Sequence, residues 1–235
     1  MMKISSRQNP WFKRIREAIR EHAGEIVIEG PKAVSDALAA GWTPIKVVTR
    51  DVDFSSEIFD SLAETKSPQN VIGLFERPRV SIGALFGRET SIVIALDGVQ
   101  DPGNVGTIVR LAAAFDANGI ALLPGCADAF GPKAIRASAG ATLTVPTVRC
   151  TSEELLAHGW PIVAADTRAE IADPPSRRAI LAFGSEGSGL SPAIASVART
   201  IAIGMSSGME SLNVASAAAI LLARSYALRS QGTTA

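Results

Sequence analysis

The chain has 235 residues, of which 47% are hydrophobic and 20% charged, and its 23 basic residues balance its 23 acidic ones. This composition is ordinary for a soluble globular protein of one large domain or two modest ones, and a net charge of zero excludes a uniformly basic surface for nucleic acid. Two cysteines and two histidines, far apart in the sequence, exclude a disulfide framework and make a metal site unexpected.

The N-terminal sequence MMKISSRQNPW lacks the apolar core of a signal peptide, and no apolar run approaches the ~20 residues of a membrane span. We therefore expect a cytoplasmic protein that binds neither membrane nor metal.

The first 79 residues alternate between predicted helices and short predicted strands. Helices are expected at 9–22, 31–41 and 55–66, and strands at 26–30, 45–50 and 71–76. Residues 1–20 carry six basic groups and one acidic group, whereas residues 21–79 are net acidic. The pattern predicts a small α/β domain over residues 1–79, followed by a linker at 80–90, where proline and glycine interrupt the periodicity.

Residues 91–235 show the alternation of a second α/β domain. Apolar runs predict strands at 91–97, 119–125, 144–150, 161–166, 179–186 and 200–205, and an alanine-rich helix is expected from Ser211 to about Arg229. Continuous apolar strands separated by helices indicate a parallel sheet, in which ligands usually bind at the carboxyl ends of the strands.

The first of three polar turns lies within DGVQDPGNVGTIVRLAAAF, residues 97–115. Asn104 is expected to cap the helix that follows, and Gly103 and Gly106 would let its backbone approach a ligand closely. Arg110 is the single charged side chain of this apolar helix. Taken alone, it is explained better by a solvated surface position than by a functional one.

The second turn is FGSEGSGL, residues 183–190. It lacks the lysine of a phosphate-binding loop, and the carboxylate of Glu186 would repel a phosphate, so a ligand with hydroxyls or a positive centre fits better. A flexible turn without function is the alternative.

The third turn lies in IGMSSGMESLNVASAAAI, residues 203–220, where Ser211 and Asn213 precede a helix of small residues. Simple capping would also explain these two side chains.

The three turns resemble, in the same order, the three motifs of the SpoU–TrmH family of S-adenosylmethionine-dependent RNA 2′-O-ribose methyltransferases. The matching segments are DPGNVGTIVR, LAFGSEGSGL and IGMSSGMESLNVASAAAI. The resemblance covers residues 91–230. Residues 5–13 and 25–38 are similar to the family's accessory substrate-binding domain, which resembles ribosomal protein L30e. One position departs from the family pattern, because Gly204 stands where the third motif commonly has proline.

The resemblance implies a catalytic domain with a deep trefoil knot and S-adenosylmethionine as the cofactor. The implied cofactor-binding residues are Gly184, Glu186, Ile203, Met205 and Leu212, and the implied catalytic residues are Asn104, Arg110, Glu186, Ser211 and Asn213. The family arginine is often assigned as the general base for the ribose hydroxyl. Because a guanidinium hardly deprotonates in proteins, we expect Arg110 instead to stabilise the 2′-oxygen electrostatically, with Asn104 and Glu186 fixing its geometry.

The resemblance also implies partners. Structured RNA would be bound through Arg7, Lys13, Arg14, Lys133 and Arg136, with ribosomal RNA favoured over transfer RNA. Family members are homodimers in which the last helix and the first-motif helix lie near the two-fold axis, and the small residues at 215–219 are compatible with such packing.

Two other classes of protein remain as alternatives. A non-catalytic RNA-binding protein of the same fold is disfavoured by the intact Asn104, Arg110, Glu186 and Asn213. A nucleotide- or dinucleotide-dependent enzyme is disfavoured by the missing phosphate-loop lysine and the missing GxGxxG.

Overall fold

The computed structural model describes residues 3–21, 24–63, 68–88, 90–206 and 208–231. The chain divides into two compact units, one of residues 1–79 with 130–136 and the other of residues 80–129 with 137–235.

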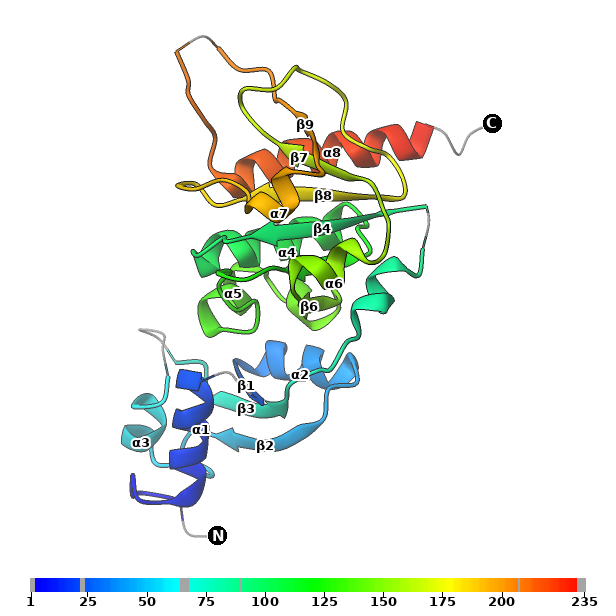
Figure 1. Ribbon diagram of the computed structural model, residues 1–235. Helices are drawn as coiled ribbons and strands as arrows, with labels where there is room; N and C mark the ends of the chain where they lie inside the picture. The colour runs from blue at the N-terminus through cyan, green and yellow to red at the C-terminus, as the bar shows by residue number, and fades with distance from the viewer. Residues whose placement is uncertain (1–2, 22–23, 64–67, 89, 207, 232–235) are drawn as a thin grey trace. The chain divides into compact units, whose positions relative to one another are not determined.

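The N-terminal unit is built on a three-stranded antiparallel sheet of order β1-β3-β2 (Figure 1). Its elements are α1 (Pro10–Glu21), β1 (Glu25–Glu29), α2 (Pro31–Ala39), β2 (Pro44–Thr49), α3 (Ser56–Asp60) and β3 (Val71–Glu76). Phe12 and Ile15 of helix α1 pack with Phe59 and Leu74 in one hydrophobic core.

The helix expected at 55–66 is shorter in the structure. Helix α3 ends at Asp60. The Ser61 hydroxyl donates to the carbonyl of Ile58, one of the last carbonyls of the helix, which have no backbone donor within the helix itself. Residues 64–67 of the expected helix lie outside the described residues.

The rest of the chain supplies a six-stranded sheet of order β6-β5-β4-β8-β7-β9, in which every pairing is parallel. Its elements are η1 (Ile82–Phe86), β4 (Ile92–Asp97), α4 (Pro102–Ala114), β5 (Gly119–Leu122), η2 (Ala141–Leu143), β6 (Thr147–Arg149), α6 (Ser152–Leu156), β7 (Ile162–Ala165), β8 (Ala179–Gly184), α7 (Pro192–Ala195), β9 (Arg199–Ile201) and α8 (Val214–Gln231). Helix α5 (Pro132–Ala137) follows β5 in the chain, and all but its last residue belong to the N-terminal unit. The predicted parallel α/β architecture is confirmed, whereas the trefoil knot stays a prediction.

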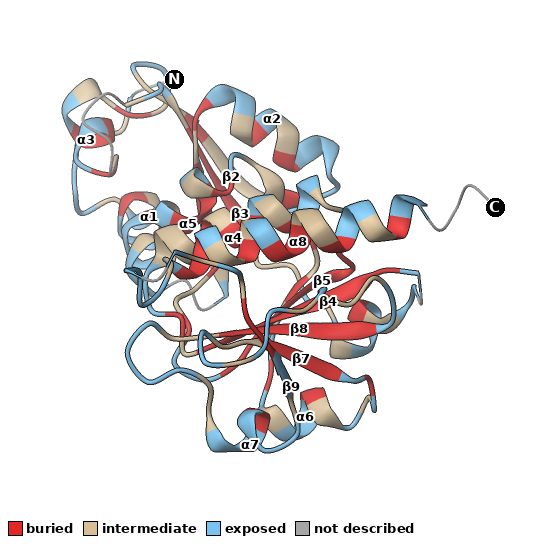
Figure 2. Cartoon of the chain, turned by 90° about the horizontal axis from the view of Figure 1, so that it is seen from above, coloured by how far each residue is buried: buried red, intermediate tan, exposed pale blue. Residues whose placement is uncertain are grey.

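The central strands of this sheet are buried on both faces (Figure 2). On one face, Ile94 of β4 packs with α4 and α8; on the other, Val93 and Ala95 pack with η1, α6 and α7. This explains the continuous apolar runs of the sequence, because alternate residues of each strand enter different cores.

Helices α4 and α8 are joined by a buried arginine near the end of α8. Arg229 Nη2 donates to the carbonyl of Phe115 at 2.7 Å, and its Nη1 lies 3.4 Å from the hydroxyl of Ser91. Burial lowers the pKa of Arg229. The contact satisfies a carbonyl at the C-terminal end of α4 and fixes the two helices against each other.

Among the residues that the structure describes, no helix combines the length and apolarity needed to cross a bilayer.

Candidate active site

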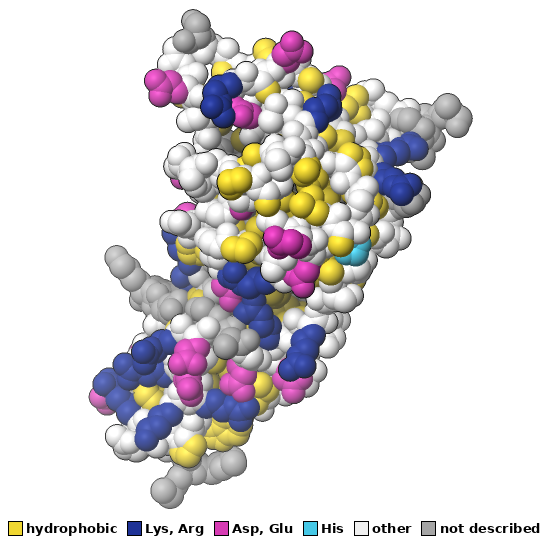
Figure 3. Space-filling model, viewed as in Figure 1, with side chains coloured by type: hydrophobic (Ala, Val, Ile, Leu, Met, Phe, Trp, Pro, Cys, Tyr) yellow, Lys and Arg dark blue, Asp and Glu magenta, His cyan; other side chains and the backbone are white. Residues whose placement is uncertain are grey.

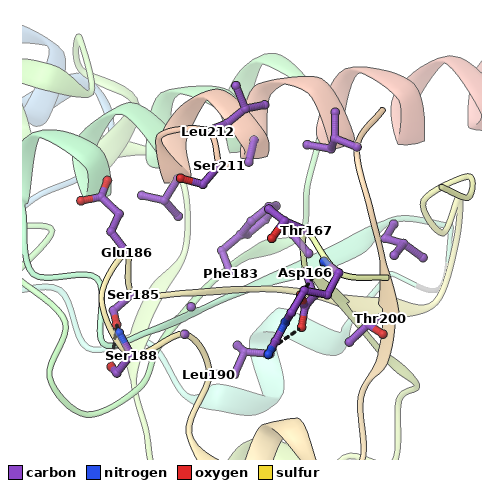
Figure 4. A pocket seen from close by; sticks show the side chains of 18 of the residues that line it. Asp166, Thr167, Phe183, Ser185, Glu186, Ser188, Leu190, Thr200, Ser211 and Leu212 are labelled. Carbon is purple, nitrogen blue, oxygen red and sulfur yellow. Dashed lines mark hydrogen bonds and ion pairs between the residues drawn. The ribbon is translucent and has the colours of Figure 1, made fainter. Parts of the chain in front are cut away.

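A cavity of about 690 Å³ opens at the carboxyl ends of β7, β8 and β9 and beside the start of α8. Three loops contribute to its walls, with residues 165–168, residues 184–190, and a third set of Ile203, Met205, Ser211 and Leu212 (Figure 4). Glu186 lies at one end of the cavity and Thr200 at the other. This is the edge at which parallel sheets usually bind ligands.

The cavity brings together every residue predicted to bind the cofactor. Its lining includes Gly184, Glu186, Ile203, Met205 and Leu212, together with Ser211. Ile203, Leu212 and the buried ring of Phe183 give it an apolar surface, and the glycine-rich loop adds backbone polar groups.

Gly184 is required by the way this loop doubles back on itself. A Cβ atom at Gly184 would lie 2.4 Å from the carbonyl carbon of Gly189. Ser185 and Gly189 exchange backbone hydrogen bonds of 3.0 Å, which close the loop into a tight hairpin. The hairpin leaves Glu186 at its exposed tip.

Three side chains, one from each polar turn, meet at Glu186. Asn104 Nδ2 donates to Glu186 Oε1 at 3.1 Å, Asn213 Nδ2 donates to the same oxygen at 3.0 Å, and Asn213 Nδ2 lies 3.2 Å from Asn104 Oδ1. Residues separated by 82 and 109 positions in the sequence therefore form one polar cluster.

Helix capping fixes the direction of the Asn213 amide. Its Oδ1 accepts from the backbone N–H of Ala215 at 2.9 Å and of Ser216 at 3.3 Å, at the first turn of α8. Because the oxygen points into the helix, the NH₂ group must point toward Glu186 and Asn104. The helix expected to start at Ser211 accordingly starts at Val214.

The expectation that Asn104 caps α4 is wrong. The cap is Asp101, whose carboxylate accepts from the Asn104 backbone N–H at 3.0 Å, and Pro102 occupies the first helical position. Proline suits that position because its fixed φ is already helical, and this moves the cap upstream of Asn104. The Asn104 side chain is thus available for Glu186.

A second cavity, of about 220 Å³, adjoins the first. It is lined by residues 98–101 and Asn104, and it shares residues 185–188 and Val214 with the larger cavity. Within the cluster, Glu186 lines both cavities and Asn104 lines the smaller one, while Asn213 binds Glu186 from outside the two linings.

Arg110 lies apart from this cluster. Its side chain is exposed, and the described residues that line the two cavities do not include it. Arg110 is six positions after Asn104, which places it about 9 Å along the helix and about 120° around the axis. Within one chain, Asn104 and Glu186 do not hold Arg110 as expected.

The model of the SpoU rRNA Methylase family matches residues 91–223, more than half of the chain. The chain belongs to the SpoU rRNA methylase family.

Several relatives align with this SpoU family chain over almost the whole of their own length. A Synechocystis protein described as an uncharacterized tRNA/rRNA methyltransferase is 31% identical over 93% of this chain and 91% of the relative. The 23S rRNA (guanosine(2553)-2′-O)-methyltransferase RlmP of Bacillus subtilis is 29% identical over 94% and 98%. The 23S rRNA (uridine(2479)-2′-O)-methyltransferase of Streptomyces viridochromogenes is 28% identical over 92% and 87%.

Solved structures agree with this assignment. An AdoMet-bound rRNA methyltransferase from Sinorhizobium meliloti superposes with a TM-score of 0.87 at 28% identity, covering 97% of this chain and 98% of the neighbour. The SpoU methyltransferase AviRb from Streptomyces viridochromogenes, in complex with the cofactor AdoMet, gives 0.82 at 26% identity, covering 94% and 98%. The resemblance to an L30e-like domain stays a prediction.

One wall of the large cavity in this SpoU family chain was not predicted from the sequence. Asp166, Thr167 and Arg168 line it directly after β7, and Arg168 Nη2 pairs with Asp166 Oδ2 at 3.0 Å. The hydrogen bonds from Arg168 lower the pKa of the Asp166 carboxyl. The signal was a polar tripeptide at the end of a predicted strand, the position where the other two turns had been found.

The side chains predicted to bind RNA are all exposed. Arg7, Lys13 and Arg14 belong to the N-terminal segment, and Lys133 and Arg136 to α5. Arg14 Nε donates to Glu25 Oε1 at 2.9 Å, so this arginine is held in place by a neighbouring strand. Among the described residues, no group of three or more His, Cys, Asp or Glu side chains is placed to hold a metal ion.

Proposed function

We propose that this SpoU family protein transfers a methyl group from S-adenosylmethionine to a ribose 2′-hydroxyl of ribosomal RNA. Family membership supports the reaction, and the relatives named for 23S rRNA support the substrate. The single observation that carries the proposal is that Asn104 and Asn213 both bind Glu186, which lines the two adjoining cavities.

The residues of the large cavity fit S-adenosylmethionine. Its volume of about 690 Å³ lies within the ~300–1,000 Å³ typical of ligand pockets. Ile203 and Leu212 suit a flat base, and the carboxylate of Glu186 is compatible with a positive centre. When bound there, the cofactor supplies a methyl group already activated on a sulfonium.

The smaller cavity would receive the acceptor ribose. A 2′-hydroxyl is a weak nucleophile, so the protein must orient it and stabilise the charge that develops on its oxygen. The amide groups of Asn104 and Asn213 hold Glu186 on the shared wall and would keep the two ligands at a fixed separation.

Arg110 would act across a homodimer interface. It is exposed on α4, and α8 beside α4 carries exposed Ile220 and Tyr226, an apolar surface suited to a second copy. In such a dimer, Arg110 of one protomer would reach the cavities of its partner and donate to the 2′-oxygen. The guanidinium would stay charged and act electrostatically instead of accepting the proton.

The remaining assignments belong to the same proposal. Residues 1–79 would bind RNA, residues 91–235 would perform methyl transfer, and residues 80–90 would link them. Ribosomal RNA is favoured over transfer RNA, and the cytoplasm is the expected compartment.

Two measurements test this function. Calorimetric titration should show binding of S-adenosylhomocysteine but not of ATP or NAD. The chain is also incubated with methyl-tritiated S-adenosylmethionine and, in separate reactions, ribosomal RNA or transfer RNA. With ribosomal RNA the label should appear in dinucleotides resistant to alkali, because a 2′-O-methyl group blocks cleavage of the adjacent phosphodiester. Label in the bases, or in transfer RNA alone, would contradict the proposal, and binding without transfer would favour a non-catalytic RNA-binding protein.

A further inference from the structure

A third cavity lies within the N-terminal unit and has no part in the site described above. Its volume is about 510 Å³, and its lining comes from α1, the turn before β1, and the ends of β2 and β3. The charged residues that line it are Arg14, Arg77 and Arg79, together with Glu25 and Glu76. Three guanidinium groups against two carboxylates leave the cavity net positive.

An aromatic ring stands beside this cavity, flanked by two cations. The Arg14 guanidinium lies 5.4 Å from the centroid of the Trp11 ring, and Lys46 Nζ lies 5.8 Å from it. Trp11 is half-buried, whereas the other two tryptophans, Trp42 and Trp160, are buried. Arg14 belongs to both groups, since it also lines the cavity.

The arrangement is fixed by the fold. Arg14 lies one turn after Trp11 on α1, and its hydrogen bonds to Glu25 of β1 hold the guanidinium between the ring and the cavity. Arg79, by contrast, is exposed and makes no hydrogen bond or ion pair within the described part of the chain. An exposed guanidinium that lines a positive cavity and has no partner among the described residues is available to bind a phosphate.

We propose that Trp11, Arg14, Lys46 and Arg79 form a binding site for one unpaired nucleotide of the RNA substrate. The base would stack on Trp11, and the neighbouring phosphates would bind Arg79 and Lys46. Lys46 reaches the ring through a flexible stem, so it can move to a phosphate when a base takes its place. This inference rests on the proposed function, because it takes RNA as the substrate.

Several features favour single-stranded RNA over another anionic partner. An aromatic ring next to cations is the arrangement by which proteins bind unpaired bases, since every base has a face to stack. The first 20 residues carry a net charge of +5, which would draw a polyanion to this part of the chain. Figure 3 shows Lys and Arg side chains, with acidic ones between them, over the N-terminal unit.

The test measures binding of a fluorescein-labelled single-stranded oligouridylate to the full chain. Trp11→Ala should weaken binding roughly tenfold to a hundredfold, as expected for the loss of one stacked base. Trp11→Phe should restore most of the affinity because it retains an aromatic face. Arg79→Ala should weaken binding and reduce the slope of affinity against salt by about one.

Arg20→Ala is the matched control. Arg20 is exposed on the same helix, about 180° around the axis from Trp11, and does not line the cavity. Its substitution should leave the affinity within about twofold, and all variants should bind S-adenosylhomocysteine as the wild type does. RNA binding should also quench part of the total tryptophan fluorescence in the wild type but not in Trp11→Phe, which lacks the stacked tryptophan.

Unchanged RNA affinity in both Trp11→Ala and Arg79→Ala would overturn the inference. So would competition by polyglutamate as strong as that by RNA of equal charge, since this would indicate a general anion site. Failure of the wild type to bind S-adenosylhomocysteine or to transfer methyl groups would instead refute the proposed function, and the two failures are therefore distinguishable.

Discussion

Asn213 uses both ends of its amide. Its oxygen caps α8, and its NH₂ group donates to Glu186, so one side chain ties the start of the last helix to the second polar turn. Asn213, Asn104 and Glu186 were predicted as site residues from the motifs that contain them. Their mutual hydrogen bonds could not be predicted, because these depend on the way three distant loops meet.

Asn213→Asp separates the two roles of this residue. Aspartate is as good a helix cap as asparagine, so the stability measured in urea should change little. The new carboxylate cannot donate and would face Glu186, so the cluster should open. Steady-state kinetics should show kcat reduced about a hundredfold, which is the order of loss that a misplacement of ~1 Å causes. Wild-type kcat in this variant would contradict a positioning role for the cluster.

The thiols of the two cysteines should be unreactive in the folded protein. Burial raises the pKa of Cys126, and burial also raises that of Cys150 to about 11. Both thiols stay protonated through pH 8, so neither should react quickly with iodoacetamide until the chain is unfolded in urea. Since their pKa values are lower in the unfolded chain, stability should be full below about pH 8.5 and fall as the pH rises toward 11. Rapid labelling of the native protein at pH 8 would be the contrary result.

At the scale of elements, the apolar runs located every strand of the sheet but overestimated their lengths. The run at 144–150 becomes Thr147–Arg149, because Pro146 cannot donate to a neighbouring strand. The strand expected at 200–205 ends at Ile201, where the third polar turn begins. Boundaries depend on tertiary contacts such as these, whereas a continuous apolar run already marks a strand buried on both faces.

The junction between α4 and α8 depends on Arg229. Arg229→Met keeps much of the side-chain volume but leaves the carbonyl of Phe115 without this donor, so unfolding in urea should show a loss of about 1.5–3 kcal/mol. Arg224→Ala, on the same helix, removes an exposed pair with Asp173 and should cost less than about 1 kcal/mol. Equal effects of the two substitutions would contradict the importance assigned to the buried arginine.

For the whole molecule, the sequence predicted a parallel sheet with ligands at its carboxyl edge, and the structure confirms that sheet. The strand order β6-β5-β4-β8-β7-β9 could not be predicted from the sequence. This order brings the loops after β7, β8 and β9 around one cavity. The separation of Arg110 from Asn104 and Glu186 within one chain was also not predicted, since a motif does not say whether its residues act in one chain or two. This is why the proposed site requires a second copy.

The most direct test of the proposed composite site is complementation between Arg110→Ala and Glu186→Ala. Each homodimer should be inactive, with a mass twice the 24.5 kDa of the chain and S-adenosylhomocysteine binding retained by Arg110→Ala. A heterodimer, coexpressed and purified through two different tags, would contain one site with both residues intact, and it should show roughly half the wild-type methyl transfer. A heterodimer as inactive as the two homodimers would contradict the claim that Arg110 of one protomer completes the site built around Glu186 in the other.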